Sequence, residues 1–274
     1  MRPSSLRIAL ISSRTPPGRL DDTLAAHMAW IDRARRAGAQ FIGFPEGSLT
    51  GYALSPDIAL PLNSPAVGAL IARARRERFH LSFGLVERRA RRFYNSQIIA
   101  GPAGLMGVVR KINLTFAEQK FFTAGRDLPV FRVGPFRLGI AICADATHAE
   151  TPRVLAHRGA NLIFAPHATY LKHTPASWYA WRMERWPLYA KDTGCWFAAC
   201  NNAGRPEHAA RGELDLRFAS GALVISPDGK IAAKSPLRAN RETMLLADLP
   251  SPAKTAHPPL IAQTNKGLFY RDLL

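Results

Sequence analysis

The sequence has little cysteine and no long apolar run. Its 274 residues include three cysteines, Cys143, Cys195 and Cys200, which are too few for a disulfide framework, and we expect the last two to be core residues. Every apolar run is shorter than the roughly 18 residues that a membrane-spanning helix needs. The N-terminal segment Leu6–Ile11 is interrupted by Arg7 and is too short for the core of a signal peptide. We therefore expect a cytoplasmic protein in a reducing compartment, with no membrane partner.

Acidic residues are also scarce. The 37 basic residues outnumber the 20 acidic ones, and the formal net charge is +17. Arginines cluster at Asp32–Arg36, Arg73–Arg78 and Glu87–Arg92, and such clusters can mark a surface that binds nucleic acid. Aromatic residues do not interleave with these arginines, and no zinc-finger or other DNA-binding motif is present. We therefore expect solvated surfaces and no nucleic-acid partner. A non-catalytic basic module that binds nucleic acid or an acidic partner is the alternative from another functional class.

Strands and helices alternate along the chain, and the 47% of hydrophobic residues are too evenly spread for a disordered chain. The expected helices are Asp21–Gly38 (capped by Asp21 or Asp22), Pro65–Arg78, Glu150–Arg158 and Trp178–Thr193. The expected strands are Leu6–Ser12, Phe41–Phe44, His80–Val86, Asn95–Ala100, Gly107–Ile112, a strand near Phe131, Leu138–Cys143, Asn161–Ala165, Trp196–Cys200, Gly221–Ile225, Lys230–Ala233 and Met244–Asp248. This pattern predicts one mixed α/β domain over residues 1–274, with two sheets packed together, helices outside and an irregular tail from about residue 250.

Three polar residues stand where apolar strands end. Glu46 follows a buried strand, Lys111 interrupts the apolar stretch Val108–Leu114, and Cys143 ends the strand that begins at Leu138. In α/β proteins the ends of strands are where sites are placed. A cysteine can supply a nucleophile, a glutamate can act as a base and a lysine can hold an anionic intermediate. Together these residues indicate a site for nucleophilic catalysis.

The segments around these residues resemble the nitrilase superfamily of carbon–nitrogen hydrolases, and the resemblance extends from Leu6 to about Asp248. The matching segments are Phe44-Pro45-Glu46 with Gly51-Tyr52; Arg110-Lys111-Ile112-Asn113-Leu114, continuing to Glu118 and Phe122-Thr123-Ala124-Gly125; and Gly139-Ile140-Ala141-Ile142-Cys143-Ala144-Asp145. Supporting matches include Tyr94-Asn95-Ser96 and Pro227-Asp228-Gly229. The fold that this resemblance implies is a four-layer α-β-β-α sandwich, paired into a homodimer or a higher homo-oligomer.

The resemblance also implies roles for individual residues. Glu46 would be the general base that takes the proton of Cys143, and Cys143 would form a covalent thioester with the substrate. Lys111 and the backbone N–H of Ala144 would stabilise the oxyanion. Glu118 would lie beside the lysine and the substrate. No metal and no organic cofactor are implied.

The residues expected to contact the substrate are Tyr52, Asn113, Ala144 and His167. Asn113 stands where many members of the superfamily carry histidine. His167 follows an expected strand, and it either lines the mouth of the pocket or lies in a surface loop.

The resemblance implies an amidase-type hydrolase that releases ammonia from a small amide or carbamoyl compound. Members that bind a carboxylate of the substrate often carry arginine shortly after the cysteine. Here Ala146, Thr147 and His148 follow, which argues against an N-carbamoyl amino acid. A nitrilase, or an amide or acyl transferase that uses the same thioester, is the alternative among enzymes.

Overall fold

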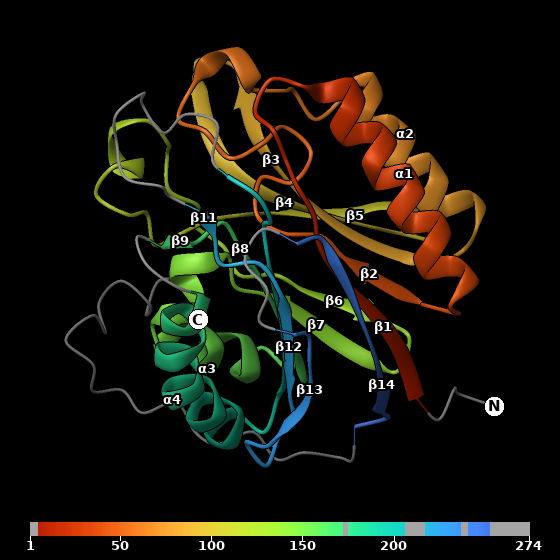
Figure 1. Ribbon diagram of the computed structural model, residues 1–274, viewed down its shortest axis with the longest axis vertical. Coiled ribbons are helices and arrows are strands. Elements are labelled where there is room, and N and C mark those ends of the chain that lie inside the picture. Colours follow the sequence, from red (N-terminus) through yellow and green to blue (C-terminus); the bar gives the residue numbers. More distant parts are fainter. Residues whose placement is uncertain (1–4, 172–174, 206–216, 237–240, 253–274) are drawn as a thin grey trace.

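Two six-stranded sheets form the centre of the computed structural model, which describes residues 5–171, 175–205, 217–236 and 241–252 (Figure 1). The first sheet consists, in spatial order, of β14 (Thr243–Pro250), β1 (Ser5–Ser12), β2 (Phe41–Gly43), β3 (His80–Arg89), β4 (Arg92–Gly101) and β5 (Gly104–Arg110). The second consists of β13 (Ile231–Lys234), β12 (Ala222–Ile225), β10 (Trp196–Asn201), β8 (Leu162–His167), β7 (Phe136–Ile140) and β6 (Val130–Val133). A two-stranded pair of β9 (Tyr170–Leu171) and β11 (Arg217–Phe218) lies apart from both sheets.

Four helices cover the outer faces of the sheets. Helices α1 (Leu20–Arg36) and α2 (Pro65–Arg76) lie on the first sheet, and α3 (Glu150–His157) and α4 (Pro175–Thr193) lie on the second (Figure 1). Alternate residues of β1 pack in different apolar clusters. Ile8 and Leu10 pack between the sheets, whereas Ala9 and Ile11 pack beneath α1 and α2. This alternation follows from the two-residue period of a strand buried on both faces. The expected α-β-β-α sandwich is confirmed.

The strand directions bring the residues that follow several strands to one end of the molecule. β1, β2 and β3 are parallel in the first sheet, and β7, β8 and β10 are parallel in the second. β5 runs in the direction of β3, because both are antiparallel to β4. Arg14, after β1, forms a parallel bridge with Ala203, after β10, so the carboxyl ends of the two sets of strands meet. Glu46, Lys111 and Cys143 follow β2, β5 and β7 at this common end.

Several predicted element ends differ from the structure, and two of the differences involve residues to which the sequence analysis gave a role. β7 ends at Ile140, and Cys143 begins a short 3-10 turn that runs to Thr147, although Ala141 and Ile142 continue the apolar pattern of the strand. Helix α1 begins at Leu20 after Arg19. Asp21 and Asp22 therefore lie inside its first turn, where their charges favour the helix dipole, and not at the cap.

In the described part of the chain, no helix is long and apolar enough to cross a membrane. The tail that the sequence predicts from about residue 250 lies almost wholly outside the described residues, which end at 252.

Gly84 allows β3 to approach the turn after β2, and we expect alanine there to destabilise the fold. A Cβ atom at Gly84 would lie 2.4 Å from the backbone nitrogen of Gly47 and 2.9 Å from the carbonyl oxygen of Pro45. Overpacking of this kind costs about 1–3 kcal/mol, so Gly84→Ala should lower the free energy of unfolding in urea by about that amount.

Gly68 provides the matched control. It lies in α2, and a Cβ atom there would meet nothing within 4 Å. Gly68→Ala should raise the free energy of unfolding by up to about 1 kcal/mol, because alanine favours a helix. Equal stability of the two variants would contradict the close approach at Gly84.

Candidate active site

Glu46 lies in the turn after β2, which contacts both the sheet and α1. Ser48 in this turn accepts a hydrogen bond from the backbone N–H of Gly84 (3.1 Å), and its hydroxyl lies 3.1 Å from Nε2 of His27 in α1. The Glu46 side chain is buried, and its Oε2 accepts a hydrogen bond from the backbone N–H of Ala168 (2.7 Å). These contacts fix the carboxylate at the end of the first sheet.

Lys111 directly follows β5, and its ammonium group lies between two carboxylates. Its Nζ is 2.8 Å from Oε1 of Glu46 and 2.8 Å from Oε1 of Glu118. The three side chains are 1%, 1% and 0% exposed, respectively. An ammonium this deeply buried is tolerated only with close opposite charges. The pairing therefore accounts for a lysine within an apolar stretch.

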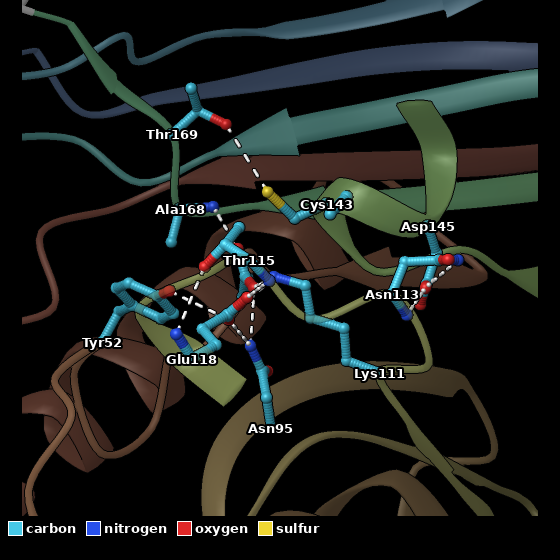
Figure 2. Close-up of polar contacts among 12 residues, drawn as sticks. Tyr52, Asn95, Lys111, Asn113, Thr115, Glu118, Cys143, Asp145, Ala168 and Thr169 are labelled. Carbon is cyan, nitrogen blue, oxygen red and sulfur yellow. Dashed lines mark hydrogen bonds and ion pairs between the residues drawn. The ribbon is translucent and has the colours of Figure 1, made fainter. Parts of the chain in front are cut away.

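Glu118 is held by contacts at both of its carboxylate oxygens. It begins the 3-10 helix Glu118–Lys120, and Thr115 donates its backbone N–H to Oε2 (2.8 Å). The hydroxyl of Tyr52 donates to Oε1 (2.9 Å). The structure thus places Tyr52 on the carboxylate that faces Lys111 (Figure 2).

Asn95 in β4 bridges the two carboxylates. Its Nδ2 donates to Oε1 of Glu46 (2.7 Å) and to Oε1 of Glu118 (3.1 Å). The sequence offered a signal for this residue, a polar Asn-Ser pair inside an apolar strand, but no role was assigned to it. Asn95 and Lys111 together link Glu46 to Glu118.

Cys143 has a left-handed backbone conformation, with φ of 47°. Such strain at a residue other than glycine costs on the order of 1–3 kcal/mol and is concentrated at functional sites. In the 3-10 turn, the backbone N–H of Asp145 donates to the carbonyl oxygen of Ile142. The backbone N–H groups of Cys143 and Ala144 therefore come before the first hydrogen bond of the turn. The sulfur lies 3.6 Å from the hydroxyl oxygen of Thr169 (Figure 2).

Asp145 ties the cysteine turn to the segment after Lys111. Its buried carboxylate accepts hydrogen bonds from the backbone N–H groups of Asn113 (2.7 Å) and Ile112 (3.2 Å) and from Nδ2 of Asn113 (2.9 Å). Burial raises the pKa of Asp145 to about 6, although these hydrogen bonds oppose the rise. The structure therefore turns Asn113 toward Asp145 (Figure 2), and its contact with the substrate stays a prediction.

His167 is completely buried at the end of β8 and does not lie in a surface loop or at an open pocket mouth. Its ring centroid lies 5.2 Å from that of Trp186 in α4. Burial lowers the pKa of His167 well below its usual value, and the charges of Arg182 and Lys111 add to this, so the imidazole is neutral. Its role toward the substrate stays a prediction.

Two residues near the sulfur carried no signal in the sequence. Thr169 follows β8, and Asn201 of β10 fixes its backbone by accepting its N–H (3.0 Å) and donating to its carbonyl oxygen (2.9 Å). Arg182 of α4 is 7% exposed and donates from Nη2 to the hydroxyl of Thr169 (3.1 Å). In the sequence Arg182 is one arginine among many, and only the fold brings it near Cys143.

The charges of the site act on one another. Burial lowers the pKa of Lys111, but the nearby charges of Glu46, Cys143 and Glu118 outweigh it and raise this pKa well above its usual value. Burial raises the pKa of Glu118, but Lys111 outweighs burial and lowers it. Lys111 is therefore a fixed cation and Glu118 a fixed anion at neutral pH.

The sequence of the chain matches the model of the carbon–nitrogen hydrolase family over residues 7–256. The chain belongs to this family. Mouse omega-amidase NIT2 is 27% identical to the hydrolase over 261 residues, which cover 90% of this chain and 89% of the mouse protein. An (R)-stereoselective amidase of Pseudomonas sp. is 27% identical over 191 residues, which cover 69% of this chain and 66% of that protein.

Solved structures show the same fold. An amidase from Nesterenkonia sp. superposes on the hydrolase with a TM-score of 0.77 at 24% identity, over 92% of each chain. A further structure of the Nesterenkonia sp. AN1 amidase, a variant, carries the acetamide moiety of fluoroacetamide covalently bound to the active-site cysteine of that protein. The resemblance inferred from the sequence is confirmed at the level of family and fold.

We expect Cys143 of the hydrolase to be a protonated thiol at neutral pH. Burial, with a smaller contribution from the charge of Glu46, raises the pKa of Cys143 to about 12, and the opposing charges of Lys111 and Arg182 only partly reduce the rise. Because the thiolate is the reactive form, labelling by methyl methanethiosulfonate should accelerate about tenfold per pH unit up to about pH 10, beyond the usual cysteine pKa of ~8.5.

Peptide mass spectrometry at timed quench points measures the labelling of Cys143. Glu46→Gln removes a negative charge that raises the pKa, so the profile of this variant should move to lower pH. A plateau near pH 8 in the parent protein would contradict a buried, protonated thiol.

Proposed function

We propose that the hydrolase is an amidase, which cleaves the C–N bond of a small amide or carbamoyl compound through a thioester on Cys143 and releases ammonia. One observation carries the proposal: the Lys111 ammonium, held 2.8 Å from both Glu46 and Glu118, lies at the same end of the fold as the strained Cys143. The names of the mouse and Pseudomonas relatives support an amide as the substrate.

Acylation begins with proton transfer from the thiol of Cys143 to Glu46. The sulfur attacks the amide carbon, a C–S bond forms, and the carbonyl oxygen becomes an oxyanion. Lys111 and the backbone N–H of Ala144 stabilise this oxyanion. The C–N bond then breaks, and Glu46 returns its proton to the nitrogen, which leaves as ammonia.

Deacylation uses the same groups with water as the nucleophile. Glu46 takes a proton from water, the hydroxyl attacks the thioester carbon, and the C–S bond breaks. The proton returns to the sulfur, and the carboxylic acid leaves. The contacts of Glu118 with Lys111 and Tyr52 keep the ammonium in place through both halves of the reaction.

The two enzymatic alternatives use the same thioester. A relative from Pyrococcus abyssi named nitrilase is 28% identical over 209 residues, which cover 73% of this chain, so a nitrile substrate is included in the test below. Capture of the thioester by an amine would make the protein a transferase. The alternative of a non-catalytic basic module is opposed by the buried Glu46, Lys111 and Glu118 cluster, because burying these charges is expensive.

We also propose that the hydrolase acts in the cytoplasm, as a homodimer or a higher homo-oligomer, and without a metal or organic cofactor. Leu188, 61% exposed on α4, suits a contact between subunits. Within the described residues, no group of three or more His, Cys, Asp or Glu side chains is placed to hold a metal ion.

Ammonia release from a panel of small amides, carbamoyl compounds and nitriles tests the proposal. We expect release from amides that exceeds release from nitriles of the same carbon skeleton. Addition of hydroxylamine should not divert most of the acyl group to the hydroxamate if water is the natural acceptor. Preferential nitrile hydrolysis or dominant hydroxamate formation would replace the amidase assignment with one of its alternatives.

A further inference from the structure

His27 is a buried polar side chain on α1, and the mechanism above does not use it. It is 2% exposed, and its ring stacks on that of Phe44, with the two centroids 4.1 Å apart. The ring of Phe83 in β3 meets the imidazole edge-on, at 6.5 Å. Phe44 directly precedes the Pro45-Glu46 pair. The imidazole therefore lies between α1 and the segment that carries the proposed base.

The hydrogen bonds of His27 are consistent in only one direction. Its Nδ1 lies 2.6 Å from the carbonyl oxygen of Thr23, which can only accept, so Nδ1 carries a proton. Burial lowers the pKa of His27 to about 4, and the hydrogen bond to Thr23 opposes this only in part. The ring is therefore neutral at neutral pH, and Nε2 is an acceptor. The hydroxyl of Ser48, 3.1 Å from Nε2, donates to it.

Ser48 connects His27 to β3. Because its hydroxyl donates its proton to His27, its oxygen is left to accept, and it accepts the backbone N–H of Gly84 at 3.1 Å. Ser48 is completely buried and stands two residues after Glu46 in the same turn. One directed chain of hydrogen bonds therefore links the backbone of α1, the turn after β2 and the backbone of β3.

Other contacts hold the backbone of this turn at the residues on either side of Ser48. The N–H of Leu49 donates to the carbonyl oxygen of Gly84 (2.8 Å), and the carbonyl oxygen of Leu49 accepts the hydroxyl of Thr23 (2.5 Å). Asn202 donates from Nδ2 to the carbonyl oxygen of Glu46 (2.8 Å). A turn held at so many points has one preferred conformation, and the side chain of Ser48 is the part that His27 controls.

We propose that His27 is a positioning residue for the general base. Through Ser48 it holds the turn after β2 in the conformation that directs the carboxylate of Glu46 toward the nucleophile. The contact at stake is short, because Oε1 of Glu46 lies 2.8 Å from Nζ of Lys111. This inference rests on the proposed function, since it takes Glu46 as the base.

His27→Leu removes both ring nitrogens at a similar side-chain volume and tests the proposal. We expect kcat for the best amide substrate to fall roughly 10- to 100-fold, because reacting groups displaced by about 1 Å can lose about 100-fold in rate. KM should stay within about threefold, because no group that binds the substrate is removed. His27→Gln, whose amide oxygen can accept from Ser48, should retain most of the parent kcat.

Ser48→Ala and Ser235→Ala form a matched pair, because both serines are buried and accept a backbone N–H. The partner of Ser235, which follows β13, is the N–H of Ala222 (2.8 Å). Ser48→Ala should lower kcat as His27→Leu does. The double variant should be no slower than either single variant, because both substitutions break the same chain. Ser235→Ala should keep the parent kcat even if its stability falls.

The pH profile of Cys143 labelling reports the position of Glu46 without any turnover. The charge of Glu46 contributes to the raised pKa of Cys143. If the carboxylate is displaced in His27→Leu, the profile should move to lower pH, in the direction expected for Glu46→Gln. The profile of Ser235→Ala should match that of the parent protein.

A parent-like kcat in folded His27→Leu would overturn the proposal, and so would a lower kcat with an unchanged labelling profile. If His27→Leu does not fold, Ser48→Ala is subject to the same two criteria. If the parent protein hydrolyses no amide but the labelling profile moves as expected, the amidase assignment fails and the positioning of Glu46 stands. If amides are hydrolysed and neither kcat nor the profile changes in the variants, the positioning role fails and the amidase assignment stands.

Discussion

Cys143→Ala should abolish ammonia release from the best amide substrate, with a loss of about 10⁴-fold or more, because removal of a covalent nucleophile leaves only binding and oxyanion stabilisation. The variant should still fold, because the substitution removes one sulfur atom and breaks no contact on which the fold depends. Steady-state ammonia assays, together with circular dichroism of the variant, measure both effects.

The other two cysteines provide matched controls. Cys195 and Cys200 are fully buried in two different apolar clusters, and the Cys195 sulfur contacts the carbonyl oxygen of Ala160 at 3.2 Å. Cys195→Ala and Cys200→Ala should retain the activity of the parent enzyme, with a modest loss of stability. An equal loss of activity in Cys143→Ala and Cys195→Ala would contradict the assignment of the nucleophile.

Lys111→Met should reduce both activity and stability. Loss of one oxyanion donor lowers kcat roughly 10²- to 10³-fold. Loss of one partner from a buried ion pair lowers the free energy of unfolding by about 3–5 kcal/mol, because Glu46 and Glu118 then remain buried without the ammonium. Amide turnover and urea denaturation at neutral pH measure the two effects.

The loss of stability in Lys111→Met should depend on pH and should be smaller in acid. In the parent protein Lys111 outweighs burial and lowers the pKa of Glu118, so the ionised Glu118 stabilises the fold above its unfolded pKa and this stabilisation is lost in acid. Without Lys111, burial raises the pKa of Glu118, and its protonation stabilises the variant at low pH. The difference in unfolding free energy between the parent and Lys111→Met should therefore shrink as the pH falls from 7 toward about 4.

The double variant Lys111→Met, Glu118→Gln separates the two roles of the lysine. It should regain part of the stability, because one of the two uncompensated carboxylates is gone, but it should stay inactive. A double variant as unstable as Lys111→Met would contradict charge repulsion as the cause. Activity of Lys111→Met near that of the parent would contradict its role at the oxyanion.

The sequence predicted the layers of the fold because the apolar strands and amphipathic helices are long and regular. It failed where geometry departs from the local pattern. Ala141 and Ile142 continue the apolar strand, yet hydrogen bonding in β7 ends at Ile140 and Cys143 adopts a φ of 47°. The two-residue strands β9 and β11 are too short to produce any periodicity.

Part of the candidate site was predictable because its residues lie in segments with a recognisable sequence pattern. Glu46, Lys111 and Cys143 each lie in a distinctive segment, and the structure brings them to one end of the two sheets. Thr169 and Arg182 lie in segments without such a pattern, and their position follows from the packing of α4 on the second sheet. Long-range packing of this kind leaves no local trace in a sequence.

The most direct test of the central claim is the mass of the enzyme during turnover. Acid quench of the parent enzyme during turnover of its best amide substrate, followed by mass spectrometry of the intact chain and its peptides, detects any acyl group on the protein. We predict that the mass increases by that of the acyl group, that the added mass lies on the peptide that contains Cys143, and that Cys143→Ala lacks it. Turnover of the amide without any acylated Cys143 peptide, or with the acyl group on another residue, would contradict the thioester mechanism.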